Sequence, residues 1–315
     1  MARTRREMLK KGSLAGGTVL VGSLAGCGGL GGGGNTTVTA ASMQWAEAEL
    51  MGYLGYESLK ANTEYNIEDE LTLGGSQQCF RAVKNREVDF YHLYTGGAYA
   101  TIPPQHDEKP DSPEEAYEVA KREMEEEHGL IYLERAKFNN TYAIALRPGF
   151  AEETGVETIS EFAEYLNDGN TDVRVVLGSE FAEREDGWPG LTEEYGFSDV
   201  ADELDVRRIG ADLTYQVLGE GEADAGMVFT TNPKIQQYDL AVLEDDRTFF
   251  LPYNPAALVN SEKLSEVPEI EEPLNEPMRA LDSEETVIEL NARISLDGED
   301  VQEVARDFLS SEGII

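Results

Sequence analysis

Strand-like and helical patterns alternate along the chain from about residue 37 to its end, and this alternation constrains the fold more than any other feature. Short apolar runs predict strands at 37–41, 70–73, 88–91, 130–134, 142–146, 173–177, 225–229 and 241–243. Between most of them lies a segment with helical spacing of its apolar residues, such as 45–61. Regular alternation favours an α/β fold with mainly parallel sheets, each covered by helices. The roughly 280 residues involved exceed one ordinary core, so two lobes are expected.

Start signals mark three of the expected helices. Ser112 can cap a helix that has Pro113 at its first position and an acidic residue three positions after the cap. Residues 158–161 repeat this capping pattern. Apolar residues in 301–309 fall on one face at helical spacing, and the pair 297–298 is the expected start of that last helix.

The N-terminal residues have the pattern of an export signal. A twin-arginine motif at 4–10 precedes an apolar stretch at 14–25 that contains three glycines, and it is shorter than the roughly 20 apolar residues that a membrane-spanning helix needs. We therefore expect 1–26 to be a cleavable twin-arginine signal. Cys27 ends a lipobox-like sequence and is expected to carry a lipid, followed by a flexible glycine-rich tether over 27–35. A free cysteine in a spacer is the alternative. Lipidation would anchor the protein at the extracellular face of the cell membrane.

The charge balance excludes one class of partner. The chain has 62 acidic and 25 basic residues, which gives a net charge of −37. Nucleic acid is not an expected partner, because its phosphates would be repelled and no stripe of Lys or Arg occurs. Since 40% of the residues are hydrophobic, disorder is not expected. Acidity of this degree on a folded chain is typical of adaptation to brine.

Cys79 is the only cysteine besides Cys27, so it is expected to be a small buried hydrophobe without a disulfide partner.

Signals for catalysis are weak. The three histidines do not fall at metal-ligand spacing, and neither a GxSxG motif nor a phosphate-binding GxxxxGK[ST] loop is present. No metal or cofactor is predicted. A pair of facing carboxylates could serve a secreted acid/base hydrolase, but with 62 acidic residues any such pair proves nothing.

Aromatic residues beside loop ends are the strongest indication of a binding site. Tyr94, Tyr142, Tyr215 and Phe229 each stand at a predicted strand end or helix start. Ligands of open α/β sheets bind at the carboxyl ends of the strands, so these positions would line a cleft. Taken singly, each of these rings is also compatible with a place in the core.

Several motifs occur in an order that resembles the substrate-binding proteins of the glycine betaine, choline and proline family of ABC importers. The two most specific are the aromatic and glycine patterns within 181–197 and within 244–253. The resemblance covers nearly the whole chain after residue 36, and the other segments that carry it are 42–47, 73–75, 94–97, 139–143 and Tyr215.

The resemblance implies a two-lobed clamshell like that of periplasmic binding proteins. Lobe one would contain 36–139 and 232–315, lobe two would contain 140–231, and the hinge would lie near Asn140 and Thr231. The family has no enzymatic activity and delivers its solute to an ABC permease in the membrane. We expect a monomer that binds a small quaternary-ammonium ligand, with glycine betaine first and choline or a proline-like amino acid as alternatives.

The resemblance also implies which residues hold the ligand. Tyr94, Tyr142, Tyr215 and Phe229 match the aromatic cage of the family, whose π faces can hold a methylated nitrogen that has no N–H to donate. Arg184 matches the residue that binds the ligand carboxylate, although an ion pair with Asp186 or Glu183 is the alternative role.

Three positions depart from the family pattern. Phe229 replaces a usual tyrosine, Met43 a usual lysine and Gly97 a usual hydroxyl residue. The changes at Met43 and Gly97 remove polar side chains that would contact a ligand carboxylate. The sequence therefore predicts a quaternary-ammonium ligand more firmly than it predicts betaine itself. The Gly97 backbone can still donate a hydrogen bond. Trp45 is expected either to add a ring or to belong to the core.

Overall fold

The computed structural model describes residues 36–106 and 108–315. The predicted twin-arginine signal, Cys27 and the whole of the glycine-rich tether lie outside the described residues. Within the described ranges, no helix has the length and hydropathy needed to cross a bilayer.

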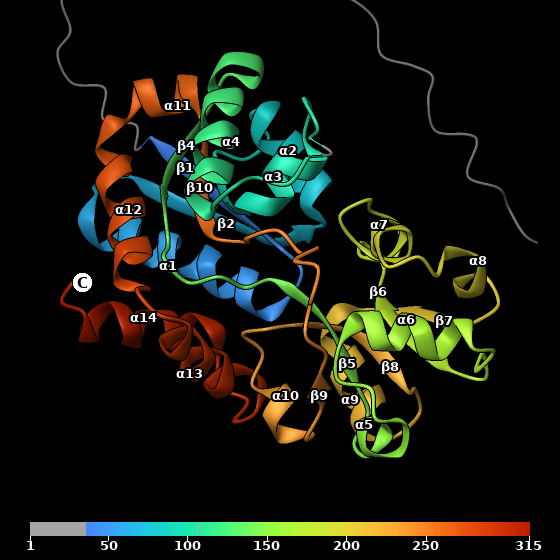
Figure 1. The fold of residues 1–315 in the computed structure, drawn as a ribbon. Helices are drawn as coiled ribbons and strands as arrows, with labels where there is room; N and C mark the ends of the chain where they lie inside the picture. Colours follow the sequence, from blue (N-terminus) through green and yellow to red (C-terminus); the bar gives the residue numbers. More distant parts are fainter. Residues whose placement is uncertain (1–35, 107) are drawn as a thin grey trace, which may run out of the picture. The chain divides into compact units, whose positions relative to one another are not determined.

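The described residues form two β-sheets with helices packed on their faces (Figure 1). The strands are β1 (Thr37–Met43), β2 (Asn66–Gly74), β3 (Phe90–Tyr94), β4 (Leu130–Arg135), β5 (Tyr142–Leu146), β6 (Arg174–Gly178), β7 (Asp205–Ile209), β8 (Ala225–Phe229), β9 (Ala241–Val242) and β10 (Pro255–Asn260). The helices are α1 (Ala46–Asn62), α2 (Ser76–Lys84), α3 (Thr95–Thr101), α4 (Pro113–His128), α5 (Phe150–Thr154), α6 (Ile159–Asn167), α7 (Trp188–Glu194), α8 (Ser198–Ala201), α9 (Thr214–Gly219), α10 (Lys234–Gln237), α11 (Ser261–Glu266), α12 (Glu271–Ala280), α13 (Glu284–Ser295) and α14 (Val301–Ser311), with short 3₁₀ turns at Ala211–Leu213 and Pro268–Ile270.

The two sheets have the same layout. The first has the strand order β2-β1-β3-β10-β4 and the second the order β7-β6-β8-β5-β9. In each sheet four strands point one way, and the fifth, β10 or β5, runs against both of its neighbours. The predicted α/β fold is confirmed, and the sheets are mixed because the reversed strand of each arrives from the other sheet.

Two segments carry the chain between the sheets. The first joins β4 to β5, and the second joins β9 to β10 (Figure 1). They lie side by side, since the Asn140 N–H donates to the Tyr253 carbonyl at 3.0 Å and the Thr141 hydroxyl to the Leu251 carbonyl at 3.0 Å. The first crossing passes through Asn140, and its action as a hinge stays a prediction. A second crossing near Thr231 is wrong, because β9 pairs with β5 and keeps the chain in the second sheet as far as Val242.

Helices cover both faces of each sheet. In the first sheet α1 and α12 pack on one face and α2 and α4 on the other; in the second, α9 packs on one face and α6 on the other. Successive side chains of a strand point to opposite faces of the sheet, so alternate residues contact different helix layers. In β5, for example, Tyr142 and Ile144 face the α6 layer, whereas Ala143 and Ala145 face α9.

The predicted helix starts are mostly confirmed. The Ser112 hydroxyl accepts the N–H of Glu115 at 3.1 Å, and Thr158 and Glu161 form a reciprocal capping box. The last helix begins later than predicted, at Val301, with Asp300 as its cap. Gly298 lies in the left-handed region at φ +72°, so 297–298 is a turn that precedes the helix.

Candidate functional site

Two rings of the second sheet face the same side because of strand register. Tyr142 is the first residue of β5 and Phe229 is the last residue of β8, and the antiparallel pairing sets them directly opposite each other. Directly opposed side chains on one face are close neighbours. Their ring centroids lie 5.1 Å apart and the rings are stacked. The antiparallel pair therefore builds one wall of a pocket at this end of the sheet.

The first sheet contributes the facing rings. Tyr94 ends β3, and Trp45 holds the cap position of α1 just after β1. The Trp45 ring lies 6.2 Å from Tyr94 and 5.8 Å from Phe229, measured between centroids. Aromatic residues from both sheets thus form a continuous lining.

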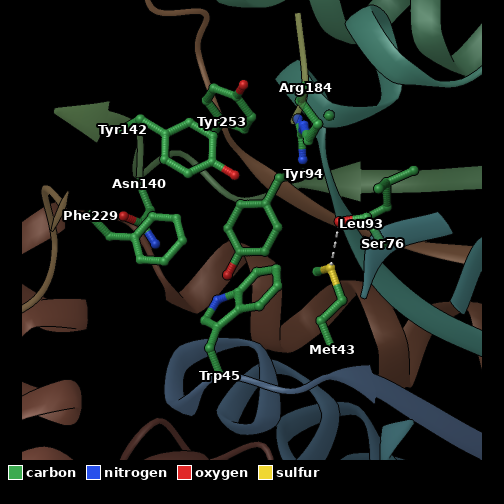
Figure 2. A pocket seen from close by; sticks show the side chains of 11 residues that line it. Met43, Trp45, Ser76, Leu93, Tyr94, Asn140, Tyr142, Arg184, Phe229 and Tyr253 are labelled. Carbon is green, nitrogen blue, oxygen red and sulfur yellow. Dashed lines mark hydrogen bonds between the residues drawn. The ribbon is translucent and has the colours of Figure 1, made fainter. Parts of the chain in front are cut away.

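These rings surround one cavity between the two sheets (Figure 2). Its empty volume is about 330 Å³, including the part that opens to solvent. The residues that line it are Met43, Trp45, Ser76, Leu93, Tyr94, Gly97, Asn140, Tyr142, Arg184, Phe229 and Tyr253. Seven of the eight predicted site residues are among them.

Tyr215 is the exception, and the prediction that it belongs to the cage is wrong. It is fully buried on the other face of the second sheet, packed with Ala143 and Val228. Its hydroxyl accepts the backbone N–H of Phe229 at 2.8 Å. Tyr215 therefore holds the strand that carries a pocket ring and does not line the pocket itself.

Arg184 lies at the mouth of the pocket, in the segment between β6 and α7. Its guanidinium carbon is 5.8 Å from the centroid of Tyr142. The guanidinium pairs with Asp186, with Nε donating to Oδ1 at 2.7 Å, and Asp186 also accepts the hydroxyl of Tyr253. The ion pair with Asp186 is confirmed, whereas Glu183 pairs with Arg208. Because the fork of five N–H donors is only partly used by Asp186, Arg184 can still donate to a ligand carboxylate.

A contact between the two sheets lies beside the mouth. Glu180, which follows β6, accepts the backbone N–H of Ser76 at 2.9 Å and the Ser76 hydroxyl at 3.1 Å. The same hydroxyl lies 3.3 Å from the sulfur of Met43 (Figure 2). Met43 is buried and lines the cavity, so it presents an apolar side chain there.

The glycines of α3 leave room for neighbouring side chains. A Cβ on Gly96 would lie 2.8 Å from the Tyr253 ring, so glycine is needed for this contact. A Cβ on Gly97 would meet the nearest Arg184 nitrogen at 3.7 Å, an ordinary contact. Gly97 thus faces the pocket beside Arg184, and its position has room for a small side chain.

Sequence reasoning missed four lining residues. Tyr253 and Asn140 stand on the two crossing segments, and Ser76 and Leu93 on α2 and β3. Tyr253 belongs to a motif that carried the family resemblance, and this motif was the signal available for it. Asn140 is a polar residue that is only 4% exposed. It belongs to the segment 139–143 that carried the resemblance, but it was predicted only as a hinge residue and not as part of the lining.

Ionisation in the pocket is fixed mainly by burial. Burial raises the pKa of Tyr142 to about 12, so its ring stays neutral at physiological pH. Burial, reinforced by the nearby Glu47, also raises the pKa of Tyr94 well above its usual value. Residues 36–106 and 108–315 contain no group of three or more His, Cys, Asp or Glu side chains placed to hold a metal ion. The predicted burial of Cys79 is confirmed, and this burial raises its pKa to about 12.

Comparisons with known proteins identify a family of substrate-binding domains that matches nearly the whole described chain. A family model described as the substrate-binding domain of the ABC-type glycine betaine transport system matches residues 36–311. The chain is 31% identical over 287 residues to the chemotactic signal transduction system substrate-binding protein CosB of Halobacterium salinarum, covering 89% of this chain and 85% of that protein. It is 28% identical over 271 residues to the glycine betaine-binding protein YehZ of Escherichia coli, covering 85% and 88%. The crystal structure of a glycine betaine/carnitine/choline ABC transporter shares the fold with a TM-score of 0.68 at 24% identity, covering 89% of this chain and 99% of that one.

Proposed function

Because the chain belongs to the family of substrate-binding domains of ABC-type glycine betaine transport systems, we propose that its pocket captures a small quaternary-ammonium osmolyte, glycine betaine first. The family consists of solute-binding components of importers, so binding and not catalysis is the activity. The observation that carries the proposal is the convergence of Trp45, Tyr94, Tyr142 and Phe229 on one cavity.

The chemistry of a methylated nitrogen fits this lining. A trimethylammonium group has no N–H to donate, so the negative faces of aromatic rings are its natural partners, at about 0.5–2 kcal/mol per desolvated ring. Four rings supply roughly 2–8 kcal/mol before the cost of ordering. With a carboxylate bound by Arg184, micromolar affinity, near −8 kcal/mol, is within reach.

Titration calorimetry with glycine betaine, choline and proline tests the proposal. Heat of binding with betaine or choline and none with proline supports it. Binding of proline alone would contradict it and would favour an amino-acid-binding protein, in which Arg184 holds an α-carboxylate. Absence of binding by all three would also contradict it.

The proposed partner is an ABC permease, to which a ligand-loaded monomer docks after the lobes close. The 31% identity to a chemotactic substrate-binding protein favours a second candidate, delivery of the same ligand to a chemotaxis transducer. Uptake of labelled betaine in cells without the gene separates the two candidates. Lost uptake indicates the permease, whereas intact uptake with lost attraction to betaine indicates the transducer.

The proposal includes export by the twin-arginine route and anchoring by a lipid on Cys27. The supporting pattern is the motif at 4–10 followed by the lipobox-like sequence. Mass spectrometry of the N-terminal peptide from cell membranes tests both at once: a lipid-modified Cys27 at the new N-terminus is expected, and an unmodified Cys27 in an uncleaved chain contradicts it.

Adaptation to brine is proposed from the net charge of −37. It predicts that the midpoint of thermal unfolding rises in molar salt, because the salt screens the repulsion among the acidic residues.

A further inference from the structure

A buried glutamate stands behind the aromatic pocket. Glu47, in the first turn of α1, is only 5% exposed and accepts four hydrogen bonds. One oxygen accepts the Tyr94 hydroxyl at 2.7 Å and the Asn140 amide at 2.8 Å. The other accepts the Thr231 hydroxyl at 2.5 Å and the Asn291 amide at 2.8 Å. One carboxyl group therefore joins a pocket ring, the first crossing segment, the end of β8 and α13.

The hydrogen bonds suit a carboxylate, because both oxygens of Glu47 act as acceptors. An amide NH₂ can only donate, and one such group bonds each of the two oxygens of Glu47. All four partners are neutral, and none of the ion pairs among the described residues involves Glu47. A charge buried without an opposite charge is costly unless something else compensates it. The hydrogen bonds compensate part of this cost, and a positive ligand nearby would supply the rest.

Tyr94 connects this carboxylate to the pocket. Its hydroxyl donates to Glu47, while its ring lines the cavity. A phenol that donates to a carboxylate gains electron density in its ring, which strengthens attraction between the ring face and a cation. The low local dielectric also strengthens the direct electrostatic attraction between the carboxylate and a positive charge in the cavity.

We propose that Glu47 is the counter-charge of the pocket and the positioning residue of Tyr94, so that the site selects ligands by the positive charge on their alkylated end. The proposal rests on the proposed function and adds its charge requirement. A pocket that recognised its ligand only by shape would bind the uncharged isostere equally well. This pocket rejects the isostere, in which a carbon atom replaces the nitrogen.

Paired ligands measure the charge requirement directly. Choline is compared with 3,3-dimethylbutan-1-ol, and glycine betaine with 3,3-dimethylbutanoate, each pair differing by carbon in place of nitrogen. We expect the wild-type protein to prefer the charged member by about a hundredfold in Kd, since several desolvated rings contribute. Glu47→Gln should lower this preference by about tenfold, while the affinity for the isostere changes by less than about threefold.

A matched control separates charge from structure. Glu57 lies on the same helix, is 4% exposed and pairs with Arg306 at 3.0 Å. Glu57→Gln removes a buried charge of the same kind away from the pocket, so it should leave the ligand preference unchanged. If Glu47→Gln weakens both members of each pair equally, Glu47 only supports the fold and the proposal is overturned.

A gentler variant covers the case in which Glu47→Gln does not fold. Tyr94→Phe keeps the ring and removes its hydrogen bond to Glu47, and it should lower the preference by about threefold. An unchanged preference would overturn the role of Tyr94 and with it the proposal. If the wild-type protein binds no quaternary amine, the proposed function itself fails. If it binds one and the Glu47 and Tyr94 variants show the same ligand preference as the wild-type protein, only the further inference fails.

Discussion

The hydroxyl of Tyr215 accepts the backbone N–H of Phe229 at 2.8 Å, from the face of the sheet opposite the pocket. Tyr215→Phe leaves that buried N–H without an acceptor, so the free energy of unfolding should fall by about 1–2 kcal/mol. The Kd for betaine should change by less than about threefold, because no ring of the pocket is altered. Chemical unfolding and calorimetry measure the two effects. A large loss of affinity without loss of stability would return Tyr215 to the binding site.

Tyr142→Leu tests a ring that lines the pocket. Leucine keeps much of the volume but has no π face, so the binding free energy should weaken by about 1–2 kcal/mol. Tyr165→Leu is the control, because Tyr165 packs on Phe150 in the same lobe and does not line the pocket. An unchanged Kd for Tyr142→Leu would remove Tyr142 from the site.

Arg184→Ala tests the carboxylate anchor. Betaine should lose about 10- to 100-fold in affinity, since a charge-assisted hydrogen bond is removed. Choline has no carboxylate and should bind as before or more tightly, because Asp186 is freed from its ion pair. Arg208→Ala, at an exposed ion pair with Glu183, is the control. Equal losses for the two ligands would show that Arg184 does not hold a carboxylate.

His92 predicts a pH dependence of stability that is separate from binding. It is 2% exposed, neither ring nitrogen has a hydrogen-bond partner within the described part of the chain, and burial lowers its pKa to about 3. Between about pH 6.5 and pH 3 the unfolded chain binds one more proton at this residue than the folded chain does. Stability is therefore lost as the pH falls through this range. Relative to His92→Gln, the free energy of unfolding should fall by about 1.4 kcal/mol per pH unit. Identical slopes for the two proteins would show that His92 also protonates in the folded state.

Strands with a clear pattern were predictable, and two others were not. β5 and β8 have the predicted bounds, because both are short apolar runs. β7 (Asp205–Ile209) is an edge strand with Asp205, Arg207 and Arg208 exposed to solvent, so hydrophobicity gave no signal. β10 (Pro255–Asn260) is buried throughout and therefore shows no alternation, and its first residue is a proline.

The pocket was predictable where residue type alone indicates chemistry. Tyr142 and Phe229 are aromatic at strand ends, and the register of β5 and β8 brings them together as expected. Tyr215 is also an aromatic residue at the start of a helix, α9, but α9 packs on the face of the sheet opposite the pocket. Which face a helix covers is set by the tertiary structure and is not visible in the sequence. The importance of Glu47 was hidden for a related reason. Among 62 acidic residues, only the fold distinguishes a buried carboxylate from the solvated ones.

The most direct test of the central claim is a crystal structure of the protein grown with glycine betaine. The account predicts that the trimethylammonium group lies against the rings of Tyr94, Tyr142 and Phe229, with the carboxylate directed toward Arg184. Betaine bound elsewhere, or an empty pocket at saturating betaine, would contradict the account.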